Sequence, residues 1–340
     1  MSVNIGSKRI GTGDLFFVIE EGQANLGDFE KALSMIDYAA DAGADAIEFQ
    51  LARADDFYVK THPGYEIYLK REFSETQLIK LVSKVKEKGL EMIAVPLSHR
   101  LVNPLVKAGC SAFNVNASDL NNPDIIDAVI DSGLPFFLSL PLATEEEIDW
   151  VVNRVKKSGD GKFILLLGQH TMASGENVVN IEHTSLGNIS TLKEKYQVPV
   201  GFIDHTPLKW MPACAVAAGA DTVSKHLTWS RDEKGPDWHI CLEPNEMKDA
   251  ITWAYKINQS IKTKNRQLAP GENLDRSIMR RSIVASKIIK SGKPIERNDI
   301  CFKQPGNGID PAQYNDIIGK VARRDILPDE QIKTFDLEDD

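Results

Sequence analysis

Short runs of apolar residues alternate with amphipathic segments from about residue 14 onward. The runs are too continuously apolar for strands with one face in water, so we predict parallel strands buried on both faces. Eight such strands interleaved with helices favour an α/β fold of the closed (β/α)8, or TIM barrel, type. The expected strands are Leu15–Glu20, Ala46–Leu51, Glu91–Pro96, Ala112–Asn116, Pro135–Pro141, Lys162–Gly168, Val198–His205 and Thr222–Thr228.

A short pattern recurs immediately before several of these strands. Ala42-Gly43-Ala44-Asp45, Ala108-Gly109-Cys110-Ser111 and Ala218-Gly219-Ala220-Asp221 share it, and glycine there suits the left-handed cap that ends a helix. The recurrence favours a barrel of repeated units. An open, doubly wound sheet is the alternative, but no glycine-rich phosphate loop follows the first strand.

The alternation stops near the end of the chain. We expect residues 1–260 to form the barrel, residues 261–278 to form a linker and residues 279–340 to form a small β-rich domain. A unit of that size buries little apolar surface by itself, so docking onto a partner surface would stabilise it.

Composition narrows the class of partner and the compartment. A formal net charge of −9 argues against nucleic-acid binding, which requires clustered cations. No apolar run approaches the roughly 20 residues that cross a bilayer, and the first residues lack the features of a signal peptide, so we expect a cytoplasmic protein with no membrane contact. The four cysteines are scattered in apolar settings and are expected to be buried thiols.

Two histidines lie 21 positions apart, each at the end of a predicted strand. Because catalytic groups of a (β/α) barrel gather at the carboxyl ends of its strands, His205 and His226 should face one point, and two imidazoles suit a divalent metal. A hydrogen-bonded pair of histidines without metal is the alternative. The other polar residues expected around this mouth are Glu20, Gln50, Asn116, Ser139, Gln169 and Asp204.

Asp204 precedes His205 directly and admits three interpretations. Its carboxylate could orient His205, bind a substrate hydroxyl, or cap the following helix.

Several longer motifs resemble the sialic acid synthase family, from about Leu15 to Ile332. Members of that family have a (β/α)8 barrel followed by an antifreeze-like (SAF) domain. The motifs are Asp204-His205-Thr206, Lys225-His226-Leu227-Thr228, Gly235-Pro236-Asp237, Leu242-Glu243-Pro244, Arg280-Arg281-Ser282 and Pro305-Gly306-Asn307-Gly308-Ile309.

The resemblance implies condensation of phosphoenolpyruvate with the open-chain aldehyde of an N-acetylated hexosamine, which gives a 2-keto-3-deoxy sugar acid. It implies Mn²⁺ or Mg²⁺ held by His205 and His226. It also implies a domain-swapped homodimer, in which the antifreeze-like domain of one subunit closes the barrel mouth of the other. The resemblance matches Glu20 to a glutamate near the reacting centre, Gln50 to a glutamine beside the substrate and Asp237 to an aspartate that contacts the sugar. Taking these matches together with the strand-end positions, we expect catalytic roles for Glu20, Asp204 and His226. We expect substrate binding by Gln50, Asn116, Ser139, Gln169, Asp237 and Gln304.

This chain departs from the family pattern where the family binds phosphate. Glu48-Phe49-Gln50 stands where the family has Lys-Phe-Gln, Asn114 replaces another lysine, and Gln304 replaces an arginine. Exchanging a lysine for glutamate reverses the sign of an interaction worth about 1 to 4 kcal/mol at about 4 Å. We therefore expect an altered donor site, for which Arg100, Arg231 and Lys209 are the candidate anion-binding residues.

Three functions follow from these features. The first is a diverged synthase, a carbon–carbon bond-forming transferase of carbohydrate biosynthesis that joins a three-carbon donor to a sugar aldehyde. The second is a metal-dependent sugar aldolase, lyase or isomerase that does not use phosphoenolpyruvate. The third is a non-catalytic relative that binds a sugar.

Overall fold

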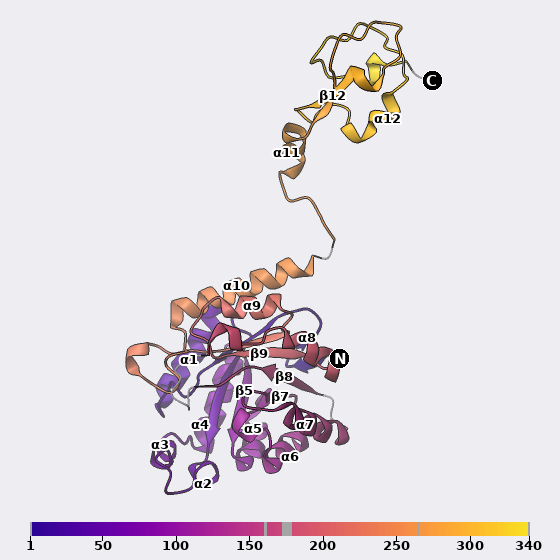
Figure 1. Ribbon diagram of the computed structural model, residues 1–340. Helices are drawn as coiled ribbons and strands as arrows, with labels where there is room; N and C mark the ends of the chain where they lie inside the picture. The colour runs from indigo at the N-terminus through magenta and orange to yellow at the C-terminus, as the bar shows by residue number, and fades with distance from the viewer. Residues whose placement is uncertain (1, 160–161, 172–178, 264, 339–340) are drawn as a thin grey trace. The chain divides into compact units, whose positions relative to one another are not determined.

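The computed structural model describes residues 2–159, 162–171, 179–263 and 265–338. It divides into two compact units, Met1–Thr263 and Lys264–Asp340, which are described separately (Figure 1).

The first unit is a closed barrel of parallel strands, as the sequence predicts. Around the barrel the strand order is β10-β3-β4-β5-β6-β7-β8-β9, so each strand pairs with the next along the chain and β10 closes on β3. The strands are β3 (Phe16–Glu20), β4 (Ala46–Ala52), β5 (Glu91–Leu97), β6 (Ala112–Val115), β7 (Phe136–Ser139), β8 (Phe163–Leu167), β9 (Val200–Asp204) and β10 (Thr222–His226).

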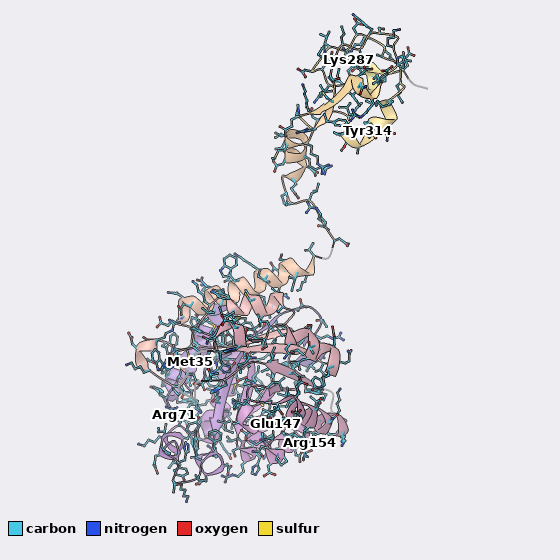
Figure 2. All side chains as sticks on the ribbon, in the orientation of Figure 1. Met35, Arg71, Glu147, Arg154, Lys287 and Tyr314 are labelled. Carbon is cyan, nitrogen blue, oxygen red and sulfur yellow. The ribbon has the colours of Figure 1, made fainter. Side chains whose placement is uncertain are left out.

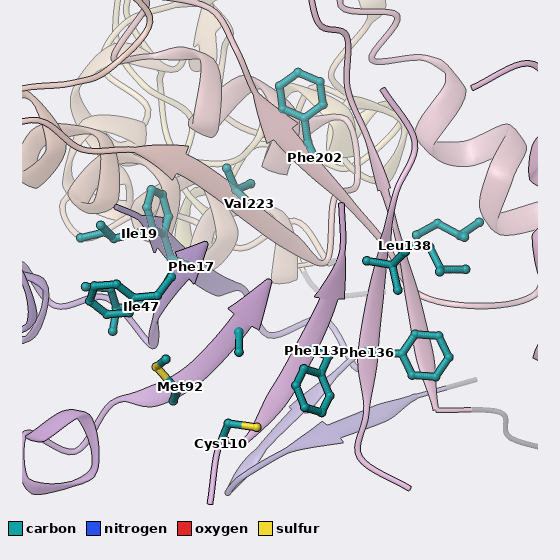
Figure 3. Close-up of a cluster of buried hydrophobic side chains, with 14 of the residues drawn as sticks. Phe17, Ile19, Ile47, Met92, Cys110, Phe113, Phe136, Leu138, Phe202 and Val223 are labelled. Carbon is teal, nitrogen blue, oxygen red and sulfur yellow. The ribbon is translucent and has the colours of Figure 1, made fainter. Parts of the chain in front are cut away.

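Helices cover the outside of this barrel. Large side chains that point outward from the strands, among them Phe17, Phe113 and Phe202, pack beneath the helices in one continuous core (Figure 3). The helices of this unit are α1 (Phe29–Ala42), α2 (Ala54–Phe57), α3 (Tyr65–Lys70), α4 (Glu75–Glu87), α5 (Val102–Ala108), α6 (Pro123–Asp131), α7 (Glu145–Lys157), α8 (Asn188–Tyr196), α9 (Met211–Ala217) and α10 (Pro244–Lys262).

Local sequence signals set the ends of several helices. Ser74 and Thr144 form capping boxes at the starts of α4 and α7, where side chain and backbone satisfy each other's hydrogen bonds. Gly43 and Gly109 end α1 and α5 in the left-handed conformation, with φ of 84° and 89°. Both glycines belong to the recurring pattern before the strands, which confirms their predicted role as caps.

The inside of the barrel is divided into an apolar and a polar part. Residues that point inward from the early part of the strands, such as Phe16, Ala46, Ile93 and Phe137, form a second apolar cluster. An N-terminal hairpin of β1 (Val3–Ile5) and β2 (Lys8–Ile10) adds Val3, Ile5 and Ile10 to this cluster. Polar side chains therefore gather at the carboxyl ends of the strands.

The second unit has its own small core and contains β11 (Ser282–Ala285), β12 (Ile300–Lys303) and α12 (Tyr314–Ile317). Its first helix, α11 (Glu272–Met279), overlaps the predicted linker 261–278, so that segment is partly helical. The backbone of Gly306 donates to the carbonyl of Ser277 on α11, which ties the helix to this unit.

Across the described residues, we find no helix with the length and hydropathy that a bilayer crossing requires.

Candidate active site

A cavity of about 360 Å³ opens at the carboxyl ends of the barrel strands. Seven of the predicted site residues line it, each from a different strand end or from the loop after β10: Glu20, Gln50, Asn116, Ser139, His205, His226 and Asp237. The structure therefore brings together one histidine pair, two carboxyl groups, two amides and a hydroxyl. Glu48, Asn114, His170 and the aromatic residues Phe57, Tyr58 and Tyr68 also line the cavity.

The histidine pair lies on one wall of this cavity. The ring centroids of His205 and His226 are 5.3 Å apart, and the ring centroid of His170 also lies 5.3 Å from that of His205. Glu20 Oε2 is 3.6 Å from His226 Nδ1. Burial holds the pKa of His205 well below its usual value and lowers the pKa of His226 to about 4, so both rings are neutral near pH 7 and can donate a lone pair.

These residues fit part of a metal coordination sphere. The Nδ1 atoms of His205 and His226 and Oε1 of Glu20 are buried without a hydrogen-bond partner among the described residues. Within that part of the chain, no three His, Cys, Asp or Glu side chains are arranged to hold a metal ion together. The two imidazoles would therefore supply two ligands, and water or substrate oxygens would supply the rest, as in catalytic sites that keep positions open.

A chain of hydrogen bonds links Glu48, Asn114 and Ser139 across the cavity, and we define these three residues as the cavity floor. Ser139 Oγ donates to Asn114 Oδ1 at 3.0 Å, and Asn114 Nδ2 donates to the two Glu48 oxygens at 3.0 and 3.2 Å. All three side chains are at most 2% exposed. Burial raises the pKa of Glu48 to about 8, because the hydrogen bonds from Asn114 offset only part of the cost of dehydrating a carboxylate.

Glu20 and Glu48 face each other on adjacent strands. They are direct partners in the β3–β4 register, and both side chains point into the barrel. Burial and the charge of Glu48 hold the pKa of Glu20 well above its usual value. Ionising both carboxyl groups would place two negative charges close together, which is unfavourable, so the floor carries little negative charge near neutral pH.

An aromatic wall, formed by Phe57, Tyr58 and Tyr68, borders the cavity beyond the end of β4. The rings of Phe57 and Tyr68 lie 5.3 Å apart and are inclined by 27°. Their helices α2 and α3 are only four and six residues long, and their sequence carries no strand or long-helix periodicity. The sequence therefore gave no signal for this wall.

Asp204 does not line the cavity. It points to the outer side of the barrel, where its carboxylate pairs with Lys225 at 3.0 Å, both side chains being fully buried. Its Oδ1 also accepts from the backbone N–H of Thr206 at 2.8 Å. Because successive strand residues face opposite sides, His205 points inward only if Asp204 points outward. This position removes Asp204 from contact with substrate in the cavity. The bond to Thr206 does not cap a helix, because the next helix, α9, begins at Met211 with Trp210 as its N-cap.

The three candidate anion-binding residues are engaged elsewhere. Arg100 pairs with Asp56 at 2.5 Å, Lys209 pairs with Asp249 at 2.8 Å, and Arg231 pairs with Glu246. None of them lines the cavity. The sequence does not indicate these pairings, because the carboxylates come from distant or unpatterned positions.

One predicted substrate-binding residue of the barrel unit, Gln169, is not among the residues that line the cavity. Gln169 follows β8, and its Oε1 is buried without a hydrogen-bond partner among the described residues. Gln304 belongs to the second unit, where its amide donates to the carbonyl of Met279.

Comparisons with known proteins agree with this architecture. Residues 35–266 match the model of the NeuB family, and residues 280–338 match that of the SAF domain. An uncharacterized protein of Methanocaldococcus jannaschii is 31% identical over 98% of both chains. The N,N'-diacetyllegionaminic acid synthase of Campylobacter jejuni is 27% identical over 93% of this chain and 98% of its own.

A solved structure extends the similarity to three dimensions. The N-acetylneuraminic acid synthetase from Leptospira borgpetersenii, in complex with citrate, matches with a TM-score of 0.74 and 30% identity. The match covers 81% of this chain and 95% of that one. With its closed barrel, its C-terminal SAF domain and these relatives, the chain belongs to the NeuB family of sialic acid synthase-like proteins.

Proposed function

We propose that this protein is a divalent-metal-dependent enzyme of carbohydrate biosynthesis that joins a three-carbon donor to the open-chain aldehyde of a sugar. The observation that carries the proposal is the pair of neutral, buried imidazoles of His205 and His226, 5.3 Å apart on the wall of a cavity large enough for a sugar. The relatives named as legionaminic and neuraminic acid synthases support the reaction class.

A Mn²⁺ or Mg²⁺ ion held by His205 and His226 would polarise the aldehyde oxygen and make its carbon more electrophilic. Around that point the chain supplies orientation. Gln50 and Asn116 can hydrogen-bond sugar hydroxyls and the acetamido group, and Asp237 can accept from a hydroxyl at the rim. The aromatic wall covers a sugar face and excludes water from one side.

Glu20 is placed to handle the proton of the reaction. Its carboxyl group adjoins His226 and is buried, and burial together with the charge of Glu48 raises its pKa well above the usual value, which favours the protonated form. Protonation of the aldehyde oxygen as the new carbon–carbon bond forms is the role that this placement supports.

The second candidate function is a metal-dependent aldolase, lyase or isomerase on the same barrel. The observation in its favour is the cavity lining, in which the described residues include no lysine or arginine to hold phosphoenolpyruvate. This candidate shares the metal and the sugar with the first and differs in the donor.

The test is to incubate the full-length protein with N-acetylated hexosamines and three-carbon carbonyl donors, with Mn²⁺ or with EDTA, and to search for coupled products by mass spectrometry. We expect a product that requires the metal and that falls by at least about a hundredfold in His226→Ala. Isomerised or cleaved sugar without coupling would support the second function. Metal-bound protein without any turnover would support a non-catalytic protein that binds a sugar.

A further inference from the structure

The charges around the cavity are unusual for a site that takes an anionic donor. Among the described residues that line it, the ionisable side chains are Glu20, Glu48 and Asp237 together with three histidines and two tyrosines, and none is lysine or arginine. Residues 160–161 and 172–178, which belong to the same unit of the chain, contain neither lysine nor arginine in their sequence.

Nearby cations do not compensate. Lys225 is on the outer side of β10 and pairs with Asp204. Arg71, labelled in Figure 2, donates Nη1 to Gln23 Oε1 at 2.9 Å. It borders a separate cavity of about 10 Å³, beyond Gln50 and Tyr68, and that space holds no more than a single water molecule.

The hydrogen-bond donors and acceptors of the floor complement those of a neutral ligand. Ser139 Oγ uses its proton on Asn114, so its lone pairs remain as acceptors, and Asn114 uses its amide donor on Glu48. Glu48 has no further hydrogen-bond partner in the described chain, which leaves its carboxyl group for a ligand. A protonated carboxyl group beside a hydroxyl acceptor matches the carbonyl and the hydroxyl of one small molecule.

From this placement we infer that the floor formed by Glu48, Asn114 and Ser139 is a subsite for an uncharged hydroxy-carbonyl compound, and that it selects against carboxylate and phosphate donors. The inference rests on the proposed function, because it names the donor class of that reaction. It makes Glu48 the residue that determines donor specificity. An anion in the same place would stand beside buried carboxyl groups, with no lysine or arginine among the described lining residues to bind it.

Hydroxyacetone and pyruvate test this inference directly, because both are three-carbon ketones of similar size and only pyruvate is charged. Their dissociation constants are measured on the full-length, Mn²⁺-loaded protein by calorimetry or, with Mg²⁺, by NMR titration. We expect hydroxyacetone to bind at least about tenfold more tightly than pyruvate. Equal binding, tighter binding of pyruvate, or binding of neither ketone overturns the inference.

Two variants locate the effect. Ser139→Ala should weaken hydroxyacetone binding by at least about fivefold and leave pyruvate unchanged, since it removes the acceptor that a hydroxyl uses. Glu48→Lys should reverse the preference, and if this buried lysine prevents folding, Ser139→Ala still decides the outcome. The control is Ser132→Ala, whose hydroxyl bonds to the carbonyl of Val129 at the end of α6 and should leave both affinities unchanged.

The same samples separate this inference from the proposed function. If Mn²⁺ binding depends on His205 and pyruvate binds as tightly as hydroxyacetone, the enzyme proposal stands and the donor inference fails. If the ketone preference holds and Mn²⁺ binding does not depend on His205, the donor inference stands and the metal proposal fails.

Discussion

Replacing Glu48 by glutamine should stabilise the barrel relative to wild type, and this advantage should grow as the pH rises. The side chain is 2% exposed, and burial raises its pKa from 4.5 to about 8. Between these two values the folded protein holds a proton that the unfolded chain releases, so the free energy of unfolding falls with increasing pH. The stability linked to Glu48 is complete below about pH 4.5 and is lost progressively up to about pH 8.

The size of the effect follows from the two pKa values. Each pH unit between them changes the free energy of unfolding by about 1.4 kcal/mol, so the loss between about pH 5 and pH 7 amounts to roughly 2.5 kcal/mol. Glutamine accepts the same hydrogen bond from Asn114 and does not ionise. The advantage of Glu48→Gln over wild type should therefore grow by this amount across that range.

Urea unfolding followed by tryptophan fluorescence measures this, because all five tryptophans lie within the barrel unit. The control is Glu87→Gln on the exposed surface of α4, whose stability should run parallel to that of wild type at both pH values. If the Glu48→Gln curve also runs parallel to wild type from pH 5 to pH 7, Glu48 is not a buried proton-binding group and the account of the cavity floor is wrong.

Two other substitutions test the surroundings of the site. Lys225→Met leaves the Asp204 carboxylate buried without its partner and should lower the free energy of unfolding in urea by about 3 to 5 kcal/mol. The double variant Asp204→Leu with Lys225→Met should recover much of this loss. Equal losses in the single and double variants would contradict the stabilising role of the ion pair. Gly22→Ala places a methyl carbon 2.5 Å from His226 Cδ2 at a φ of 52°, so it should weaken Mn²⁺ binding by at least about fivefold. Gly133→Ala is the matched control, because its φ of 67° carries a similar backbone cost of about 1 to 2 kcal/mol and no atom lies within 4 Å of the added carbon. Equal Mn²⁺ affinities in the two variants would contradict the assignment of His226 as a metal ligand.

The barrel was predictable because its strands are buried on both faces. Each of the eight predicted strands overlaps an observed one, with ends that differ by at most two residues. The hairpin of β1 and β2 was missed, because strands of three residues are too short to show a period. Its place also depends on a cluster that it shares with residues from several barrel strands, which the sequence pattern does not show.

The site was predictable where strand ends alone decide the position, as for Glu20, His205 and His226. The outward orientation of Asp204 could also have been predicted, because alternation along a strand prevents Asp204 and His205 from both facing the cavity. Arg100, Lys209 and Arg231 could not be placed from sequence, since their partners Asp56, Asp249 and Glu246 decide where the cations point.

The central claim is that His205 and His226 jointly bind a divalent ion, and a Mn²⁺ titration by calorimetry or electron paramagnetic resonance tests it most directly. Wild type should bind one Mn²⁺ per barrel, and His205→Ala should remain folded and lose at least about tenfold in affinity. His183→Ala, at an exposed histidine outside the cavity, should bind as wild type does. Unchanged affinity and stoichiometry in folded His205→Ala would contradict the account.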